Sequence, residues 1–435
     1  MLKLNSISKD VLFANDLANE TNEQKVRVNS GEKPIETTRR EIVASGRLVA
    51  CEYLGNLINS ESAKGEKYVS RMASLGLGDV DYASYAKAHK EKKMLFCAAL
   101  ADKAAGRSTT IKSYDDFKKN HIVYANDATF WKANAAIDQD VLTPIFFDVV
   151  SSVGMGLMDW EPVPLGATKV INVPSNDVFF FEDSSFGSVR STTKNYLYAT
   201  SVSLTPKVTA CNVTIKWYQD LVNGDAGRYY ASIMRGMYSK IYTRLIGLLS
   251  AAVSDTKYIP AGLTADTYTT SNWLNITDLV AAANGVRVAD LVAIGTRSAL
   301  SNVLPIDGTG ALVAGLAYGL GEQWFTNGFL AKAGQVDLLP VSKSIVPGTQ
   351  NSTLDTIDTG DNIFILAKGG YGYRPMMGVY AEGSPLILSA NPLGATGSAQ
   401  GTADMTIDIN VSAYFDIAPI FASKVGVIES VYPEG

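Results

Sequence analysis

The chain has 435 residues, of which 46% are hydrophobic and 19% charged, and its formal net charge is −5. This is the composition of a globular protein with two or three domains, less charged than an average soluble domain. Its three cysteines, Cys51, Cys97 and Cys211, lie far apart, which excludes a disulfide-rich scaffold and suits a reducing compartment. Charges interrupt the N-terminal stretch where a secretory signal would be apolar, so no signal peptide is expected.

The charge is unevenly distributed along the chain. Residues 1–132 hold 21 Lys and Arg against 17 Asp and Glu, whereas the remaining residues hold 17 against 26. Charged residues are 38 of the first 132 but only 43 of the last 303. Such a change in charge density indicates a boundary between two kinds of structure.

The N-terminal part of the chain is predicted to be helical. Residues 1–36 are polar and lack periodicity, which indicates an extended or disordered arm. A Thr and a Glu three residues apart form a capping box that predicts a helix over 38–59. A second helix is expected over 79–105, and a third, shorter one begins near Ser113. Together they make residues 1–125 a charged helical segment.

The predicted secondary structure changes from Asp140 onward. The sequence there predicts a short helix followed by strands that prolines interrupt. Apolar and polar residues alternate in "YLYATSVSL" (196–204) and "KVTACNVTIKW" (207–217), a pattern typical of strands. These two strands are predicted to form a two-stranded, partly exposed ribbon.

A single long helix is predicted over residues 227–253. The stretch is apolar enough to suggest a membrane span, but it contains Arg235, Lys240 and Arg244. Each would cost roughly 2.5–3.5 kcal/mol near the centre of a bilayer, so the membrane interpretation is rejected. Apolar side chains recur at helical spacing and form one continuous face. The residues of that face are Tyr230, Met234, Met237, Ile241, Leu245 and Leu248.

The remainder of the chain is predicted to be mixed and then β-rich. Thr277 is expected to cap a helix, which is followed by a buried strand over 290–295 and a short helix over 296–303. A glycine-rich loop spans 307–323. The predicted strands after it are 336–344, 362–367, 376–383, 405–417 and 423–431.

The residues that catalysis or metal binding would need are scarce. The only two histidines, His89 and His121, both lie in the charged N-terminal part. His89 stands among lysines and is predicted to lie on a solvated helix face, and His121 is predicted to be a polar residue at a helix end. Neither has a partner at the spacing of a zinc site, and neither belongs to a nucleophile–histidine–acid arrangement.

Glycine-rich stretches give no phosphate-binding motif either. The stretch Gly308–Gly315 lacks the spacing of a dinucleotide fingerprint and a preceding strand, and the stretch at Gly154 is a similar case. No catalytic residue, cofactor or metal ligand is therefore assigned, and the chain is predicted not to be an enzyme. The lysines of 87–93 could contact nucleic acid, although taken alone they favour a solvated helix face.

The order of these elements resembles that of the major capsid protein of tailed bacteriophages, which has the Hong Kong 97-type fold. The segment "NITDLVAAANGVRVADLVAIGTRSALSNVL" (275–304) is similar to the helix–strand–helix pattern of that family's axial domain. The tail from residue 336 onward, including "MTIDINVSAYFDIAPIFASKVGVIESV", resembles the strands of its peripheral domain.

The resemblance implies an α+β Hong Kong 97-type capsid fold, preceded by a helical N-terminal segment. The segments it implies are a charged arm (1–125), the end of that arm with the E-loop ribbon (126–215), the spine helix of the peripheral domain (216–272), the axial domain (273–349) and terminal strands of the peripheral domain (350–435). Whether residues 1–125 act as an internal scaffold stays open.

By the same resemblance, the chain would be a structural subunit that assembles into the icosahedral shell around double-stranded DNA. Its partners would be copies of itself in hexamers and pentamers, the portal and decoration proteins, and DNA through weak, non-specific contacts. It would not contact a membrane, and it would belong to the virion capsid after assembly in the host cytoplasm. The alternatives are an encapsulin-like nanocompartment shell and a β-rich tail or adhesion module.

Overall fold

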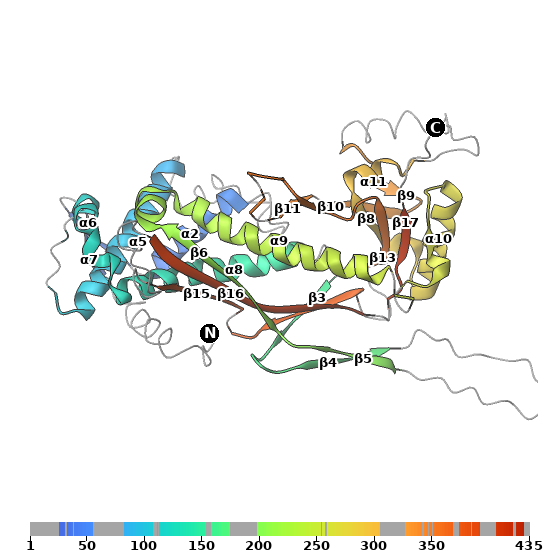
Figure 1. Ribbon diagram of the computed structural model, residues 1–435, viewed down its shortest axis with the longest axis horizontal. Helices are drawn as coiled ribbons and strands as arrows, with labels where there is room; N and C mark the ends of the chain where they lie inside the picture. The colour runs from blue at the N-terminus through green and yellow to red at the C-terminus, as the bar shows by residue number, and fades with distance from the viewer. Residues whose placement is uncertain are drawn as a thin grey trace, which may run out of the picture. The chain divides into compact units, whose positions relative to one another are not determined.

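The computed structural model of the chain describes most of the residues that form its regular elements. These are residues 26–30, 33–37, 39–54, 82–107, 111, 113–153, 158–174, 198–253, 255–256, 259–304, 327–341, 343–346, 348–349, 351–368, 374–383, 385–391, 406–420 and 423–429. Long helices alternate with small sheets along this part of the chain, which confirms the predicted α+β class (Figure 1).

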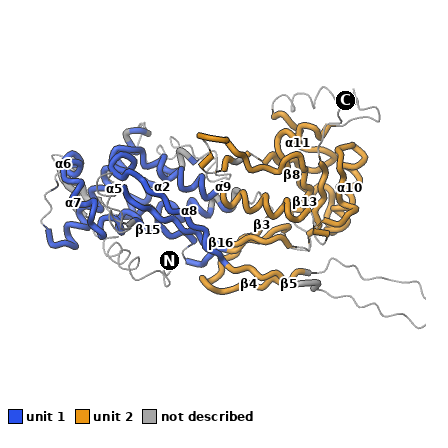
Figure 2. The backbone as a smooth tube through the Cα atoms, in the orientation of Figure 1, with its two compact units in different colours: residues 1–153, 206–238, 380–415 blue, residues 154–205, 239–379, 416–435 orange. Residues whose placement is uncertain are grey.

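The chain divides into two compact units, which Figure 2 shows in different colours. Unit 1 comprises residues 1–153, 206–238 and 380–415, and unit 2 comprises residues 154–205, 239–379 and 416–435. The division falls inside helix α9 (Ala226–Ala252) and inside strand β16 (Thr406–Pro419).

Unit 1 begins with a hairpin. Strands β1 (Val26–Ser30) and β2 (Lys33–Thr37) pair antiparallel, where an unpaired arm was expected. Residues 1–25 lie outside the described residues.

Helices follow the hairpin, and two of their ends agree with signals in the sequence, whereas residues 38 and 55–81 lie outside the described residues. They are α2 (Arg39–Leu54), α5 (Tyr82–Ala104), α6 (Tyr114–Lys119) and α7 (His121–Ala125). The Ser113 hydroxyl accepts a hydrogen bond from the Asp116 N–H at 3.2 Å and caps α6. Gly106, just after α5, has a φ of 65°, the left-handed conformation that suits a glycine at a helix end.

Helix α8 (Ala128–Val153) is much longer than the short helix predicted near Asp140. Asp127 caps its start by accepting hydrogen bonds from two backbone N–H groups, at 2.9 and 3.2 Å. Pro144 lies inside the helix, where it removes the N–H that would bond the carbonyl of Asp140. The Arg47 guanidinium of α2 donates to that carbonyl at 3.1 Å. A neighbouring helix therefore supplies the hydrogen bond that proline removes.

Helix α9 confirms the predicted long helix to within one residue at each end. Of the six residues of its predicted apolar face, Leu248 is half-buried and the other five are buried. Among the described residues, no helix is long and apolar enough to span a membrane.

In unit 1 a sheet is built around the first part of β16. Strand β15 (Leu386–Asn391) pairs antiparallel with residues 408–413, and strand β6 (Lys207–Lys216) pairs antiparallel with residues 406–415. β15 also packs against α8. The predicted pairing of β6 with the strand before it was wrong, because the β6 ladder is formed with a strand almost 200 residues later.

In unit 2 a six-stranded sheet has the order β7-β17-β13-β8-β10-β9. Its strands are β7 (Thr264–Ala265), β8 (Leu291–Thr296), β9 (Lys332–Ala333), β10 (Val336–Val341), β13 (Asn362–Ala367) and β17 (Gly426–Glu429). β8 is buried along its whole length, as predicted, and pairs parallel with β10 and antiparallel with β13. Two two-residue strands, β11 (Ser344–Ile345) and β12 (Thr356–Ile357), form a separate pair.

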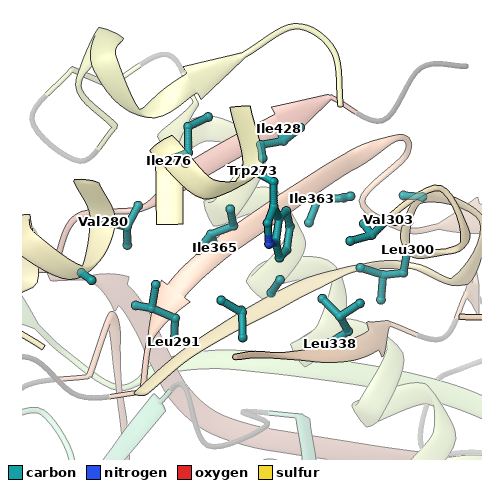
Figure 3. Packing of buried hydrophobic residues seen from close by; sticks show 14 of the residues in the cluster. Trp273, Ile276, Val280, Leu291, Leu300, Val303, Leu338, Ile363, Ile365 and Ile428 are labelled. Atoms are coloured by element: carbon teal, nitrogen blue, oxygen red, sulfur yellow. The ribbon is translucent and has the colours of Figure 1, made fainter. Parts of the chain in front are cut away.

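Helices α10 (Thr270–Asn284) and α11 (Arg297–Ser301) pack against this sheet. Trp273 and Ile276 of α10 lie in the apolar core over Ile365 and other side chains of the sheet (Figure 3). The hydroxyl of Thr269 accepts the Asn272 N–H at 3.1 Å and caps α10. The prediction that Thr277 caps this helix was wrong, since Thr277 lies inside it and is buried.

The ribbon of unit 2 consists of β4 (Lys169–Pro174) and β5 (Tyr198–Leu204), which pair antiparallel. Residues of one face, including Ile171 and Leu204, are buried against Met377 and Val379 of strand β14 (Met376–Ala381). β14 neighbours strand β3 (Met158–Val163). The approach is close at Gly378, where a Cβ atom would lie 2.5 Å from the ring of Trp160, so only glycine fits there.

Candidate functional site

His89 is buried, not solvated as predicted. Only 1% of its surface is exposed. Its Nδ1 lies 2.8 Å from the hydroxyl oxygen of Ser45 on α2, and its Nε2 lies 3.4 Å from the hydroxyl oxygen of Tyr230 on α9. Gly46 makes room for the ring, because a Cβ there would lie 2.9 Å from His89 Cε1 and 2.7 Å from a Val141 methyl.

An ion pair lies beside the histidine. Lys93, one turn further along α5, is 2% exposed, and its ammonium donates to Oδ1 of Asp138 on α8, which is 1% exposed. The hydroxyl of Tyr230 donates to the same Oδ1 at 2.7 Å, and the amide of Asn134 donates to Oδ2 at 3.3 Å. We call Ser45, His89, Lys93, Asn134, Asp138 and Tyr230 the buried polar cluster.

The buried polar cluster is not suited to catalysis. Burial, together with the neighbouring cations Lys93 and Lys92, lowers the pKa of His89 to about 3. Burial likewise raises the pKa of Tyr230 well above its usual value. A general base needs a pKa near the working pH and access to a substrate. His89 and Tyr230 have neither, so we interpret the cluster as a structural link between helices.

His121 lies at a helix end, as predicted, but it packs against aromatic rings. It is the first residue of α7, immediately after α6, and it is half-buried. Its Nδ1 lies 2.5 Å from the backbone oxygen of Lys118, and its ring lies 4.4 Å from the ring of Tyr218, between centroids. Trp217 lies near the same ring, at 5.7 Å. The contacts of His121 are thus those of an aromatic packing residue.

The remaining candidate positions give no site within the described part of the chain. No group of three or more His, Cys, Asp or Glu that could hold a metal ion occurs among the described residues. The glycine-rich stretches at Gly154 and Gly308–Gly315 lie outside those residues. Cys97 is buried, which raises the pKa of its thiol to about 12, and Cys211 is exposed.

Exposed apolar strands are the feature that points to a function. No residue of β6 is buried, and Val208 and Val213 in it are 59% and 42% exposed. In unit 2, Val170 on the outer face of β4 is 55% exposed, and Leu165 before it is 45% exposed. Apolar side chains on extended, half-paired strands gain little from burial within their own chain. They favour an interface with another molecule.

Comparison with known proteins identifies similar structures but no sequence family. No family model matches the sequence, and no curated protein matches it.

Similar solved structures include the bacteriophage PhiM1 mature capsid, which is 13% identical in sequence and has a TM-score of 0.38. The match covers 63% of this chain and 86% of the PhiM1 chain. The capsid of the cyanophage P-SCSP1u is 11% identical, with a TM-score of 0.38 and coverage of 63% and 86%. The capsid of a native GTA particle is 13% identical, with a TM-score of 0.41 and coverage of 64% and 90%.

Proposed function

We propose that this chain is a major capsid subunit, a structural protein that assembles with copies of itself into a closed shell around phage double-stranded DNA. The observation that carries the proposal is the exposed apolar surface of β6 and of the β4–β5 ribbon. A shell subunit must bury much of its surface against neighbours, and interface cores are poor in charge and rich in aromatic residues and Met. The low charge of residues 133–435 and the 21 tyrosines of the chain agree with this need.

The proposal gives each segment a role in the shell. Helix α9 in 216–272 would be the spine helix, and the β4–β5 ribbon in 126–215 would be the E-loop that lies on an adjacent subunit. Residues 273–349 would form the axial domain, and the strands of 350–435 would belong mainly to the peripheral domain. Residues 1–125 would face the interior or a neighbouring subunit.

The two alternatives predict different features. A β-rich tail or adhesion module is disfavoured by the helical content of unit 1 and by the 27 residues of α9. An encapsulin-like shell would use the same surfaces but would enclose a cargo enzyme. Purified particles that contain nucleic acid support the capsid proposal, and particles loaded with an enzyme support the alternative.

Replacing Val170 by Asp is expected to stop particle assembly while leaving the subunit folded. The side chain is exposed in the isolated chain, so a carboxylate there costs the monomer little, but it would be buried in an interface without a partner. Negative-stain microscopy and size-exclusion chromatography measure assembly, and circular dichroism measures the fold.

The matched control is Asn172→Asp, which adds the same carboxylate two residues along the same strand, at another exposed position. This variant is expected to assemble better than Val170→Asp, because it replaces a polar side chain. If Val170→Asp forms normal particles, the β4–β5 ribbon does not lie in an interface between subunits.

The proposed partners beyond the subunit itself are the portal, decoration proteins and packaged DNA, with the virion as location and the host cytoplasm as the place of assembly. The basic excess of residues 1–132 supports contact with DNA. Within the lysine run of α5, Lys87 and Lys92 are exposed, Lys90 is partly buried and donates to the carbonyl of Gly224 at 2.7 Å, and Lys93 belongs to the buried polar cluster. Only Lys92 and Lys87, the latter in a surface pair with Glu91 at 4.0 Å, are exposed enough to reach a phosphate.

Replacing Lys87 and Lys92 together by Glu is therefore expected to lower the ratio of full to empty particles. Contacts with phosphates release counterions, so the same variant should show a weaker dependence of DNA retention on salt. Sedimentation separates full from empty particles. A collapsed total yield at an unchanged ratio would instead place this face of α5 against a neighbouring subunit.

A further inference from the structure

The buried polar cluster joins four helices of unit 1 through one continuous chain of contacts. Ser45 comes from α2, His89 and Lys93 from α5, Asp138 from α8, and Tyr230 from α9. Each of these helices contributes at least one polar side chain, and all but Ser45 are almost fully buried. A change in protonation at any one position would therefore act on the packing of several helices.

The hydrogen-bond donors in this chain of contacts determine where a proton can be added. The Ser45 hydroxyl donates to the carbonyl of Ile42 at 2.8 Å, so it accepts from His89, and Nδ1 of His89 must carry the hydrogen. The Tyr230 hydroxyl donates to Asp138. The free lone pair of the neutral imidazole is then on Nε2, which faces the Tyr230 oxygen at 3.4 Å.

We propose that the buried polar cluster around His89 is an acid-sensitive latch, which holds α2, α5, α8 and α9 together while His89 is neutral and releases them when His89 is protonated. A proton on Nε2 would place a second buried cation beside Lys93, with Asp138 already engaged by the first. The cluster has no second carboxylate to neutralise it, so the charge is accommodated only if the helices separate and admit water.

Every helix of the cluster carries charged or titratable groups that act on the cluster or on one another. They are Arg39 of α2, Lys92, Lys93 and Cys97 of α5, Asp138 and Asp140 of α8, and Tyr229 and Tyr230 of α9. Asp140 is paired with Arg39 at 2.5 Å, so its charge is already balanced. Near His89 the effect of Lys93 and Lys92 therefore dominates, and both oppose a positive imidazole.

The direction of the pH effect follows from linkage. The pKa of His89 is about 3 in the folded chain and about 6.5 in the unfolded chain, so below pH 6.5 the unfolded chain binds the extra proton. Stability is fully present above pH 6.5 and is lost as the pH falls. Between pH 7.5 and pH 5.0 the unfolding equilibrium constant should rise about 30-fold through this residue alone.

The test compares urea unfolding of three versions of the whole chain at pH 7.5 and pH 5.0. The versions are the natural chain, His89→Gln, which cannot titrate in this range, and His121→Gln, which removes the only other histidine. Between pH 7.5 and pH 5.0, the folding equilibrium constant of the natural chain and of His121→Gln should fall about 30-fold more than that of His89→Gln. An equal pH dependence in the natural chain and His89→Gln would overturn the latch.

Hydrogen exchange of the natural chain provides a second measurement that does not depend on the variant folding. After correction for the intrinsic effect of pH on exchange, peptides from α2 and α5 should exchange faster at pH 5.0, because protonation of His89 in the opened state makes opening more frequent. Peptides from β8 and β13 in unit 2 should keep their protection, because no group of the latch lies in that sheet. Unchanged protection of α2 and α5 at pH 5.0 would also overturn the latch.

Discussion

Replacing Ile241 by Asp is expected to leave the chain unable to fold into a stable subunit. Ile241 is fully buried on the apolar face of α9. The substitution removes a large apolar side chain, which costs about 2–5 kcal/mol, and adds the cost of burying a carboxylate without a partner. The sum is comparable with the about 5–15 kcal/mol that stabilises a typical protein. Soluble yield, circular dichroism and the cooperativity of thermal unfolding measure the result.

The control is the same substitution at the adjacent position. Lys240 is exposed, so Lys240→Asp places an identical carboxylate in water and should change the stability by about 0.5 kcal/mol or less. If Ile241→Asp folds and unfolds at the same temperature as Lys240→Asp, the apolar face of α9 is not packed as described.

Replacing Asp138 by Ala is expected to destabilise the chain by about 3–5 kcal/mol, because it leaves the Lys93 ammonium buried without a counter-ion. The phenolic hydroxyl of Tyr230 loses its acceptor in the same step. Urea unfolding at pH 7.5 measures the loss of stability. As a control, Asp290→Ala breaks the surface pair with Arg287, whose side chain is 84% exposed, and should have little effect.

A double substitution distinguishes loss of pairing from loss of packing. Lys93→Met together with Asp138→Leu replaces both charges by apolar side chains of similar size, and such replacements of buried ion pairs are often neutral or stabilising. The double variant should therefore be more stable than Asp138→Ala. If it is equally destabilised, the pair acts through shape, and the unpaired charge of Lys93 is not the cause.

The sequence alone determined the elements whose signals are local. The apolar spacing along α9 predicted that helix and its buried face, because residues three and four apart lie on one side of a helix whatever surrounds it. The Ser113 cap of α6 and Gly106 after α5 are likewise local signals that the sequence shows directly. The unbroken apolar run of β8 predicted a buried strand, since only a strand covered on both faces tolerates such a run.

The tertiary structure decided which strands pair. β6 has the alternation of a strand, but alternation does not state its partner, and the ladder with β16 joins residues far apart in the chain. Likewise, Pro144 is tolerated inside α8 because Arg47 of α2 donates a hydrogen bond to the Asp140 carbonyl, which proline leaves without its helical donor. No local signal reports either contact.

The charged residues of α5 show most clearly that local sequence does not report long-range contacts. A run of lysines around a histidine is typical of a solvated face, and Lys87 and Lys92 do lie on one. His89 and Lys93 belong to the same run, yet both are buried. Lys93 donates to Asp138 of α8, and His89 lies beside the hydroxyl of Tyr230 of α9. A buried charge is stable only beside a partner, and that partner comes from 45 residues away in the chain, so only the folded structure shows that these two residues are interior.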